Sequence, residues 1–103
     1  MSLIDQIRTK FNCDEFDFSR HAVDQTIRRR IAVSEERQAI ASAAMIEDYP
    51  DDKYGPSCLL FCKTDKHRPL HIHVSYPSRP VIKIITLYEP DPDQWIDFAV
   101  RKP

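Results

Sequence analysis

Two histidines separated by one residue, His71 and His73, are the side chains of this chain best suited to acid–base chemistry. An unperturbed imidazole titrates near pH 6.5, so it can accept and donate a proton near neutrality. The residues around the pair alternate between polar and apolar, as in a β-strand with one exposed face. We therefore expect both imidazoles on one face of a strand, about 6.6–6.8 Å apart along it.

Three interpretations of this pair stay open. The imidazoles are close enough to bind one metal ion, they are suited to proton transfer, and they are equally typical of hydrogen-bonded surface residues. Cys58 and Cys62 do not complete a zinc site, because strand residues four apart lie about 13 Å from each other. We expect no metal and no cofactor, and we expect these cysteines to fill space rather than react.

A second group of polar residues lies on a predicted helix that runs from Ser19 to about Arg30. His21 and Arg28 are seven residues apart, which is two turns along one stripe of a helix, and Asp24 and Gln25 lie between them. An imidazole and a guanidinium in this arrangement could move a proton and hold a phosphate. The stripe is also typical of the solvated side of an amphipathic helix, whose apolar side has Ala22, Val23, Thr26 and Ile27.

The formal net charge of −1 conceals an uneven distribution. Residues 53–83 contain six basic side chains against Asp65 alone, and they include three of the four histidines. Arg28, Arg29 and Arg30 form a second basic cluster, whereas acidic residues gather in other parts of the chain. A basic region of this kind permits an anionic partner such as RNA without requiring one, and a mixed solvated surface is the alternative.

Serine residues mark the starts of the predicted N-terminal helices. Ser2, with Asp5 three residues later, begins a helix over residues 2–12. Ser19 caps the helix described above. A third helix is expected to begin at Ser34, which caps it, with acidic residues in its first turn that suit the positive end of the helix.

After the third helix the pattern changes to that of strands, whereas the earlier segment 12–18 is acidic and has no regular pattern. The segments rich in β-branched and aromatic residues are 45–49, 57–64, 69–76 and 81–89. Four-residue connections join the last three, so we expect antiparallel pairing. Asp93 is expected to cap a final helix through about Arg101, with Trp95, Ile96 and Ala99 packed inward.

Alternation along the central strands predicts which side chains share a face of the sheet. The face covered by the helices is expected to have Leu59, Phe61, Leu70, Ile72 and Val74. The other face is expected to have Cys58, Leu60, Cys62, His71, His73 and Ser75. The faces of Thr86 and Tyr88 stay open, because a shift of one residue in the connection 77–80 exchanges them with Ile85 and Leu87.

These elements predict an α+β domain spanning residues 1–103, in which N-terminal helices pack on one face of a three- to four-stranded antiparallel sheet and a short helix follows. With 42% hydrophobic and 30% charged residues, the chain is not of the disordered or low-complexity class. It has neither an apolar run long enough to span a membrane nor a signal-peptide pattern. Three cysteines without zinc-finger pairing favour a reducing, cytoplasmic location.

Several short motifs together resemble a known family over about residues 18–102. They are Ser19–Ala22, Arg28–Ile31, Ile46–Pro50, Leu70–Val74 and Ile85–Pro92 followed by Trp95. In this order and spacing they resemble the bacterial and archaeal domain-of-unknown-function family DUF4258. The family's pattern has a helix histidine, a helix arginine, a strand histidine and a Thr-x-Tyr pair, which fall on His21, Arg28 or Arg30, His71, and Thr86 with Tyr88. His73 departs from the pattern, since an apolar residue is more usual there.

The resemblance implies a topology similar to that of RelE-like ribonuclease toxins, which need no metal, and a place in a toxin–antitoxin system. RNA supplies its own 2′-hydroxyl nucleophile, so the protein must only move protons and stabilise the phosphate. On this hypothesis His21 and His71 are the acid–base residues, Arg28 holds the phosphate, and Tyr88 or Thr86 donates to it. The residues expected to bind the RNA substrate are Arg30, Lys63, Lys83 and His73.

The alternative is a non-catalytic module that binds a protein through an edge or an open face of its sheet. The expected partners are accordingly RNA and a cognate antitoxin or other protein, with no membrane and no DNA. The nuclease hypothesis requires that His21, Arg28, His71 and Tyr88 converge in one cleft. It also requires that the imidazoles emerge on the face of the sheet that the helices leave bare.

Overall fold

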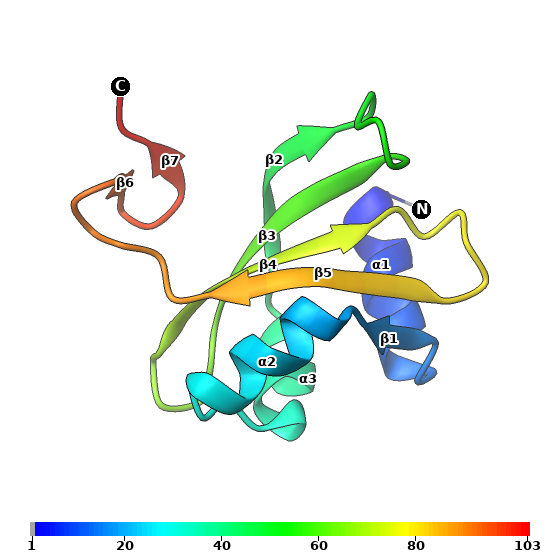
Figure 1. Ribbon diagram of the computed structural model, residues 1–103, viewed down its shortest axis with the longest axis horizontal. Coiled ribbons are helices and arrows are strands. Elements are labelled where there is room, and N and C mark those ends of the chain that lie inside the picture. The colour runs from blue at the N-terminus through cyan, green and yellow to red at the C-terminus, as the bar shows by residue number, and fades with distance from the viewer. Residues whose placement is uncertain (1) are drawn as a thin grey trace.

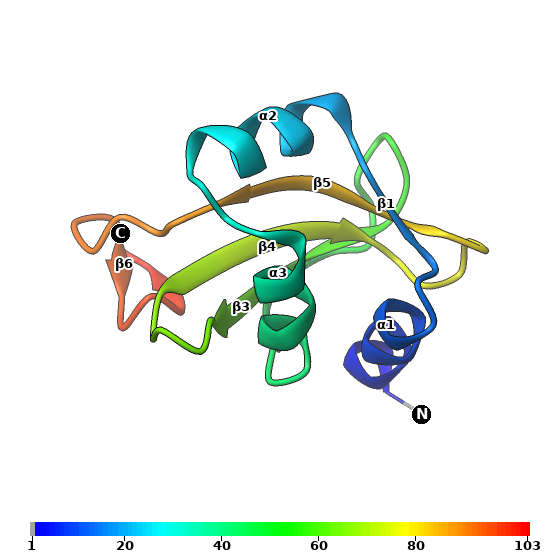
Figure 2. The same cartoon turned by 90° about the horizontal axis from the view of Figure 1, so that it is seen from below.

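Helices α1 and α3 cover one face of a five-stranded sheet, and helix α2 lies along strand β5 (Figures 1 and 2). The structure is a computed structural model that describes residues 2–103. Its elements are α1 (Leu3–Asn12), β1 (Phe16–Phe18), α2 (Arg20–Arg28), α3 (Val33–Ile40), β2 (Ala44–Tyr49), β3 (Ser57–Lys63), β4 (Pro69–Ser75), β5 (Ile82–Tyr88), β6 (Trp95–Ile96) and β7 (Val100–Arg101). Within the described residues, no helix has the length and apolar character needed to cross a membrane.

The sheet has the strand order β1-β5-β4-β3-β2, and the pairs from β2 to β5 are antiparallel. The predicted α+β class and the antiparallel meander are therefore confirmed. The predicted three to four strands were too few, because β1 adds a fifth strand parallel to β5. Phe16 pairs with Ile82 there, and the Phe16 ring stacks on Phe11 of α1 with centroids 4.5 Å apart. Three residues are too few to show a period in the sequence, and long-range contacts stabilise this strand.

Two of the three predicted helix starts are confirmed by their capping hydrogen bonds. Ser2 accepts a hydrogen bond from the backbone N–H of Asp5, and Ser19 accepts one from Ala22 at 3.0 Å. Ser34 is not the cap of α3, because Ala32, two residues earlier, is in the capping position and the helix begins at Val33. The Glu35 carboxylate accepts the Ala32 N–H instead, at 3.3 Å, so an acidic side chain satisfies the free donor at this helix end.

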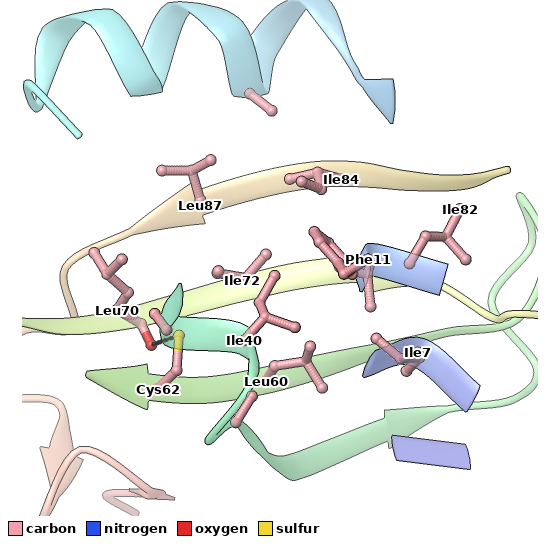
Figure 3. Packing of buried hydrophobic residues seen from close by; sticks show 14 of the residues in the cluster. Ile7, Phe11, Ile40, Leu60, Cys62, Leu70, Ile72, Ile82, Ile84 and Leu87 are labelled. Atoms are coloured by element: carbon pink, nitrogen blue, oxygen red, sulfur yellow. Dashed lines mark hydrogen bonds between the residues drawn. The ribbon is translucent and has the colours of Figure 1, made fainter. Parts of the chain in front are cut away.

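The core lies between the helices and the face of the sheet that α1 and α3 cover, which is here called the first face. Its main side chains are drawn in Figure 3. Ile7 and Phe11 of α1 and Ile40 of α3 pack there against buried strand residues. The sheet contributes Cys58, Leu60, Cys62, Leu70, Ile72, Val74, Ile82, Ile84 and Leu87. Burial raises the thiol pKa values of Cys58 and Cys62 to about 12, so both stay protonated and fill space in this core.

The predicted facing is confirmed for β4 and wrong for β3. Leu60 pairs with Ile72, whereas Leu59 pairs with His73 and Phe61 pairs with His71. Leu59 and Phe61 therefore lie on the second face of the sheet, which is the face opposite α1 and α3, and the cysteines lie in the core. Residues 58–62 are apolar throughout, so their sequence has no alternation that could indicate which residues face the helices.

A β-bulge in β5 decides the position of the Thr-x-Tyr pair. Ile84 pairs with Val74, but the next pair joins Thr86 to His73, so Ile85 is the extra residue. Thr86 and Tyr88 consequently lie on the second face beside the histidines. Side chains alternate between the two faces regularly on each side of the bulge. The position of the bulge is set by pairing with β4, so the sequence of β5 alone does not indicate it.

The predicted C-terminal helix is wrong, because this segment forms the hairpin β6–β7 (Figure 1). Asp97 and Phe98 have φ angles of 51° and 60°, and Ala99 donates to the Ile96 carbonyl to close the turn. Trp95 packs inward as expected, since it is 5% exposed and its ring meets the His71 ring edge-on at 4.4 Å. The expected inward packing of Ile96 is wrong, because successive residues of a strand face opposite sides and Ile96 is 47% exposed. The contact of Trp95 with the sheet outweighs the weak helical preference of the segment.

Candidate functional site

The second face of the sheet has a covered half and an open half. Residues 90–103, here called the C-terminal segment, lie over the ends of β4 and β5 that carry His71 and Tyr88. The part around His73 is open and is hollowed by two adjoining pockets. The two histidines that share this face therefore have different surroundings.

His71 is completely buried under the C-terminal segment. Its Nε2 lies 2.5 Å from the carbonyl oxygen of Phe98, and its Nδ1 lies 3.1 Å from the Tyr88 hydroxyl. A carbonyl only accepts, so Nε2 holds the proton and Nδ1 accepts a hydrogen bond from Tyr88. Burial lowers the pKa of His71, so its ring is neutral at pH 7 and has no free nitrogen for a substrate.

His73 lines both pockets of the open half. The first has a volume of about 460 Å³ and is lined by Tyr49, Asp52, Leu59, His73, Thr86 and Tyr88. The second, of about 300 Å³, is lined by Asp52, Tyr54, Gly55, Pro56, His73, Ser75, Arg79, Lys83 and Ile85. His73 thus lies between a mainly aromatic hollow and one that contains two cations.

A chain of hydrogen bonds fixes the His73 ring. The Ser57 hydroxyl donates to the Asp52 carboxylate at 3.0 Å, and His73 Nε2 lies 2.8 Å from the same hydroxyl oxygen. Because Ser57 gives its single proton to Asp52, its oxygen must accept from Nε2–H, and Nδ1 is left as the free acceptor of a neutral ring. Gly55, with φ of 108°, permits the turn that places Asp52 beside Ser57.

The protonation states at pH 7 agree with this arrangement. Burial lowers the pKa of His73, and the nearby Asp52 offsets part of that effect. The pKa of Asp52 is below its ordinary value because the Tyr54 N–H and the Ser57 hydroxyl donate to it. The result is an ionised carboxylate behind a neutral imidazole, which is the state needed in a general base.

Helix α2 borders the open half through Gln25. The Gln25 side-chain oxygen accepts hydrogen bonds from the Thr86 hydroxyl at 2.6 Å and from the backbone N–H of Leu87 at 2.8 Å. His21 and Arg28 lie on the same stripe of α2 as Gln25, one turn before and one turn after it, and both are exposed. The stripe is therefore at the rim of the second face, although neither residue lines the two pockets.

The predicted site residues divide into three groups in the structure. His73, Thr86, Tyr88 and Lys83 line the pockets, His21 and Arg28 are exposed on α2 outside them, and His71 is buried under the C-terminal segment. The expected convergence of His21, Arg28, His71 and Tyr88 in one cleft is therefore wrong, because the C-terminal segment covers His71 and the two α2 side chains lie outside the pockets. Arg30 is exposed between α2 and α3, and Lys63 is exposed at the end of β3, outside both pockets. No group of three or more His, Cys, Asp or Glu side chains within residues 2–103 is arranged to hold a metal ion.

Sequence reasoning missed Asp52, Tyr49 and Arg79 as pocket residues and Ser57 as the link between Asp52 and His73. Asp52 lies three residues before the single glycine of the chain, and a carboxylate in such a turn was the available signal. Ser57 could have been found only with the correct facing of β3, since it precedes the uniformly apolar run. Arg79 belonged to the basic region 53–83, but the sequence did not distinguish it from the other cations.

The profile of a family described as "Domain of unknown function (DUF4258)" matches residues 18–89 of the chain. The chain belongs to the DUF4258 family. The match confirms the resemblance over residues 18–89 and covers α2 to β5, whereas α1, all but the last residue of β1 and the C-terminal segment lie outside it. All residues that line the two pockets lie within the DUF4258 region. Neither a curated protein nor a solved structure matches the chain.

Proposed function

We propose that the open half of the second face binds RNA and cleaves it without a metal ion, with His73 as the general base. The observation that carries the proposal is the Asp52–Ser57–His73 chain beside a pocket of about 460 Å³. It presents a neutral imidazole in a defined tautomer next to a space for a substrate. A ribose 2′-hydroxyl is a nucleophile that needs only such a base.

The reaction would proceed by transesterification. His73 Nδ1 removes the proton of the 2′-hydroxyl, and the 2′-oxygen attacks the adjacent phosphorus while the bond from phosphorus to the 5′-oxygen breaks. A proton from an imidazolium passes to the leaving 5′-oxygen, for which His21 on the bordering stripe is the candidate. The products are a 2′,3′-cyclic phosphate and a 5′-hydroxyl, and no metal or oxidant enters the balance.

Positive charge beside His73 supports binding of the phosphate. Arg79 and Lys83 line the second pocket, which shares Asp52 and His73 with the first. Lys83 has one acidic neighbour, Asp17, at 3.9 Å across the β1–β5 pair. A charged hydrogen bond from guanidinium or ammonium to phosphate is stronger than a neutral one. Arg28 on the α2 rim would extend this contact along the RNA.

His71 has a different place in this proposal from the one expected on its sequence. It accepts the hydrogen bond of Tyr88, which also lines the first pocket, so it acts as a positioning residue for the Tyr88 hydroxyl. Thr86 is opposite His73 on β5 and is oriented by Gln25. The proposal also includes a RelE-like topology and a cognate antitoxin, which the order of helices followed by an antiparallel meander supports by analogy. It includes a cytoplasmic location as well, which the free cysteines favour.

Cleavage of RNA by purified protein in the presence of a chelator tests the proposal. His73→Ala should lower the rate by about 10²- to 10⁴-fold, as loss of a general base does. His67→Ala is the matched control, because His67 is exposed in the β3–β4 turn, and its rate should stay unchanged. Wild-type protein without activity, or equal rates for wild type and His73→Ala, would contradict the proposal.

Ser57→Ala keeps the His73 imidazole but removes the hydrogen bond that orients it, so it tests the orientation of the ring alone. Removing the Ser57 oxygen leaves Nε2–H without its acceptor and disconnects the ring from Asp52. We expect a lower maximal rate and a pH–rate profile whose acidic limb, which reports protonation of the base, moves to lower pH. A lower rate with an unmoved profile would show that Ser57 has only a structural role.

A further inference from the structure

An apolar groove lies on the outer side of α2, where α2 meets the start of α3. Val23, Ile27 and Val33 are 42%, 70% and 45% exposed, and together with Phe18 and Thr26 they line a hollow of about 120 Å³. One water molecule occupies about 30 Å³ of liquid, so the hollow has room for a small aliphatic side chain. Three β-branched side chains gathered in this way are typical of a contact surface.

Unpaired arginines surround this groove. Arg20 precedes Val23 and Ile27 by one and two turns of α2, and Arg29 and Arg30 lie in the connection from α2 to α3. All three are exposed, and none of them forms an ion pair within 4 Å in the part of the chain described by the structure. Asp24 is the one acidic residue of α2. The groove therefore suits an apolar side chain in acidic surroundings.

The C-terminal hairpin of this same chain has that chemistry. Ile96 and Val100 pair directly across β6 and β7, and they are 47% and 59% exposed on the side away from Trp95. Three exposed carboxylates lie close to them in sequence, at Asp91, Asp93 and Asp97. Of the nearby cations, Arg101 is held by the Glu47 carboxylate at 3.0 Å and by the Trp95 ring. The outer side of the hairpin is thus an aliphatic pair near three carboxylates that form no ion pair among residues 2–103.

We propose that the C-terminal hairpin of one copy docks into the α2–α3 groove of a second copy. Figures 1 and 2 show the hairpin and α2 on separate parts of the molecule, so the two surfaces are free to meet between copies. The contact joins two different surfaces, so it is of the head-to-tail type that forms rings or chains. Its small area makes it weak, and its charges make it sensitive to salt.

Single substitutions on each surface test the contact by sedimentation at low salt. The wild-type mass should rise with concentration below about 1 mM, the range of a weak complex, and fall when salt is added. Ile27→Asp in the groove and Ile96→Asp on the hairpin should each stay monomeric at the same concentrations. Val81→Asp is the matched control, because Val81 is as exposed as Ile96 but lies between β4 and β5, and it should associate like wild type.

A mixture of the two monomeric variants gives the sharpest result. Ile27→Asp retains an intact hairpin and Ile96→Asp retains an intact groove, so the mixture should form one-to-one pairs that cannot grow further. Reversing the charges of Arg20 and Arg30 to Glu, or those of Asp93 and Asp97 to Lys, should each abolish association, and combining both reversals in one chain should restore it.

Three outcomes would overturn the inference. They are a monomeric wild type up to about 1 mM, variants that associate like wild type, and a variant mixture that does not pair. Circular dichroism of each variant shows that it is folded. His73→Ala should associate like wild type, so failure of the RNA proposal and failure of this one are separate results.

Discussion

His71 and His73 leave the same strand on the same face, two residues apart, and yet the structure gives them opposite surroundings. Trp95 and the Phe98 carbonyl cover His71, and both of its nitrogens have partners. His73 opens into two pockets and has one nitrogen bonded to Ser57. The difference shows that the C-terminal segment, which lies outside the family match, decides which histidine of the pair can meet a substrate.

The comparison also separates two uses of a buried polar group. A buried group with all its hydrogen bonds stabilises a fold, whereas a group with a free acceptor on a pocket is available for chemistry at a cost in stability. His71 is of the first kind and His73 of the second. Three kinds of substitution test this distinction. The first exposes His71, the second removes the imidazole of His71 or of His73, and the third changes Glu36, a buried group whose hydrogen bonding is incomplete.

Removing the cover should have the largest effect on stability. Trp95→Ala deletes a side chain that is 5% exposed, and the free energy of unfolding should fall by about 3–5 kcal/mol. Because burial is the main cause of the low pKa of His71, that pKa should rise toward its ordinary value. Urea unfolding and an NMR titration of the His71 ring measure the two changes. A His71 pKa that does not move would show that the C-terminal segment does not shield the ring.

Replacing each histidine in turn should give unequal losses of stability. His71→Ala leaves the Phe98 carbonyl and the Tyr88 hydroxyl without their partner and opens a cavity, so about 2–4 kcal/mol should be lost. His73→Ala removes one hydrogen bond from a half-buried ring and should cost about 1 kcal/mol. Urea unfolding at pH 7 checks both values, and equal losses would contradict the comparison.

Glu36 extends the comparison to a buried group whose hydrogen bonding is incomplete. This side chain is 1% exposed, its Oε1 accepts from the Thr26 hydroxyl at 3.2 Å, and its Oε2 has no hydrogen-bond partner among the residues that the structure describes. Burial raises its pKa from 4.5 to about 7. Its folded form thus keeps a proton that the unfolded form releases, and stability is lost as the pH rises from about 4.5 to about 7.

Glu36→Gln should remove this pH-dependent loss. Near pH 8 the variant should be more stable than wild type by about 3 kcal/mol, and the gain should disappear below pH 4.5, where Glu36 is protonated in both states. Glu35→Gln keeps an oxygen that can accept the Ala32 N–H and should show no such gain. Unfolding curves at several pH values measure the differences, and a gain that does not depend on pH would contradict the assignment.

Much of the framework could be predicted because its signals are local. Ser2 and Ser19 mark their helices through hydrogen bonds to residues three positions later, and the four long strands are rich in β-branched and aromatic residues. The shared face of His71 and His73 follows from the alternation of side chains along one strand. These features need only a few neighbouring residues, so the sequence alone determined them.

The features that place the candidate site depend on contacts between distant residues, and only the tertiary structure decided them. The apolar run 58–62 is compatible with either facing of β3, and pairing of Leu59 with His73 selects one. The bulge at Ile85 brings Thr86 to the second face, and the packing of Trp95 on His71 turns an expected helix into a hairpin. Local preferences in these segments are weak, so the burial and pairing available in the complete fold outweigh them.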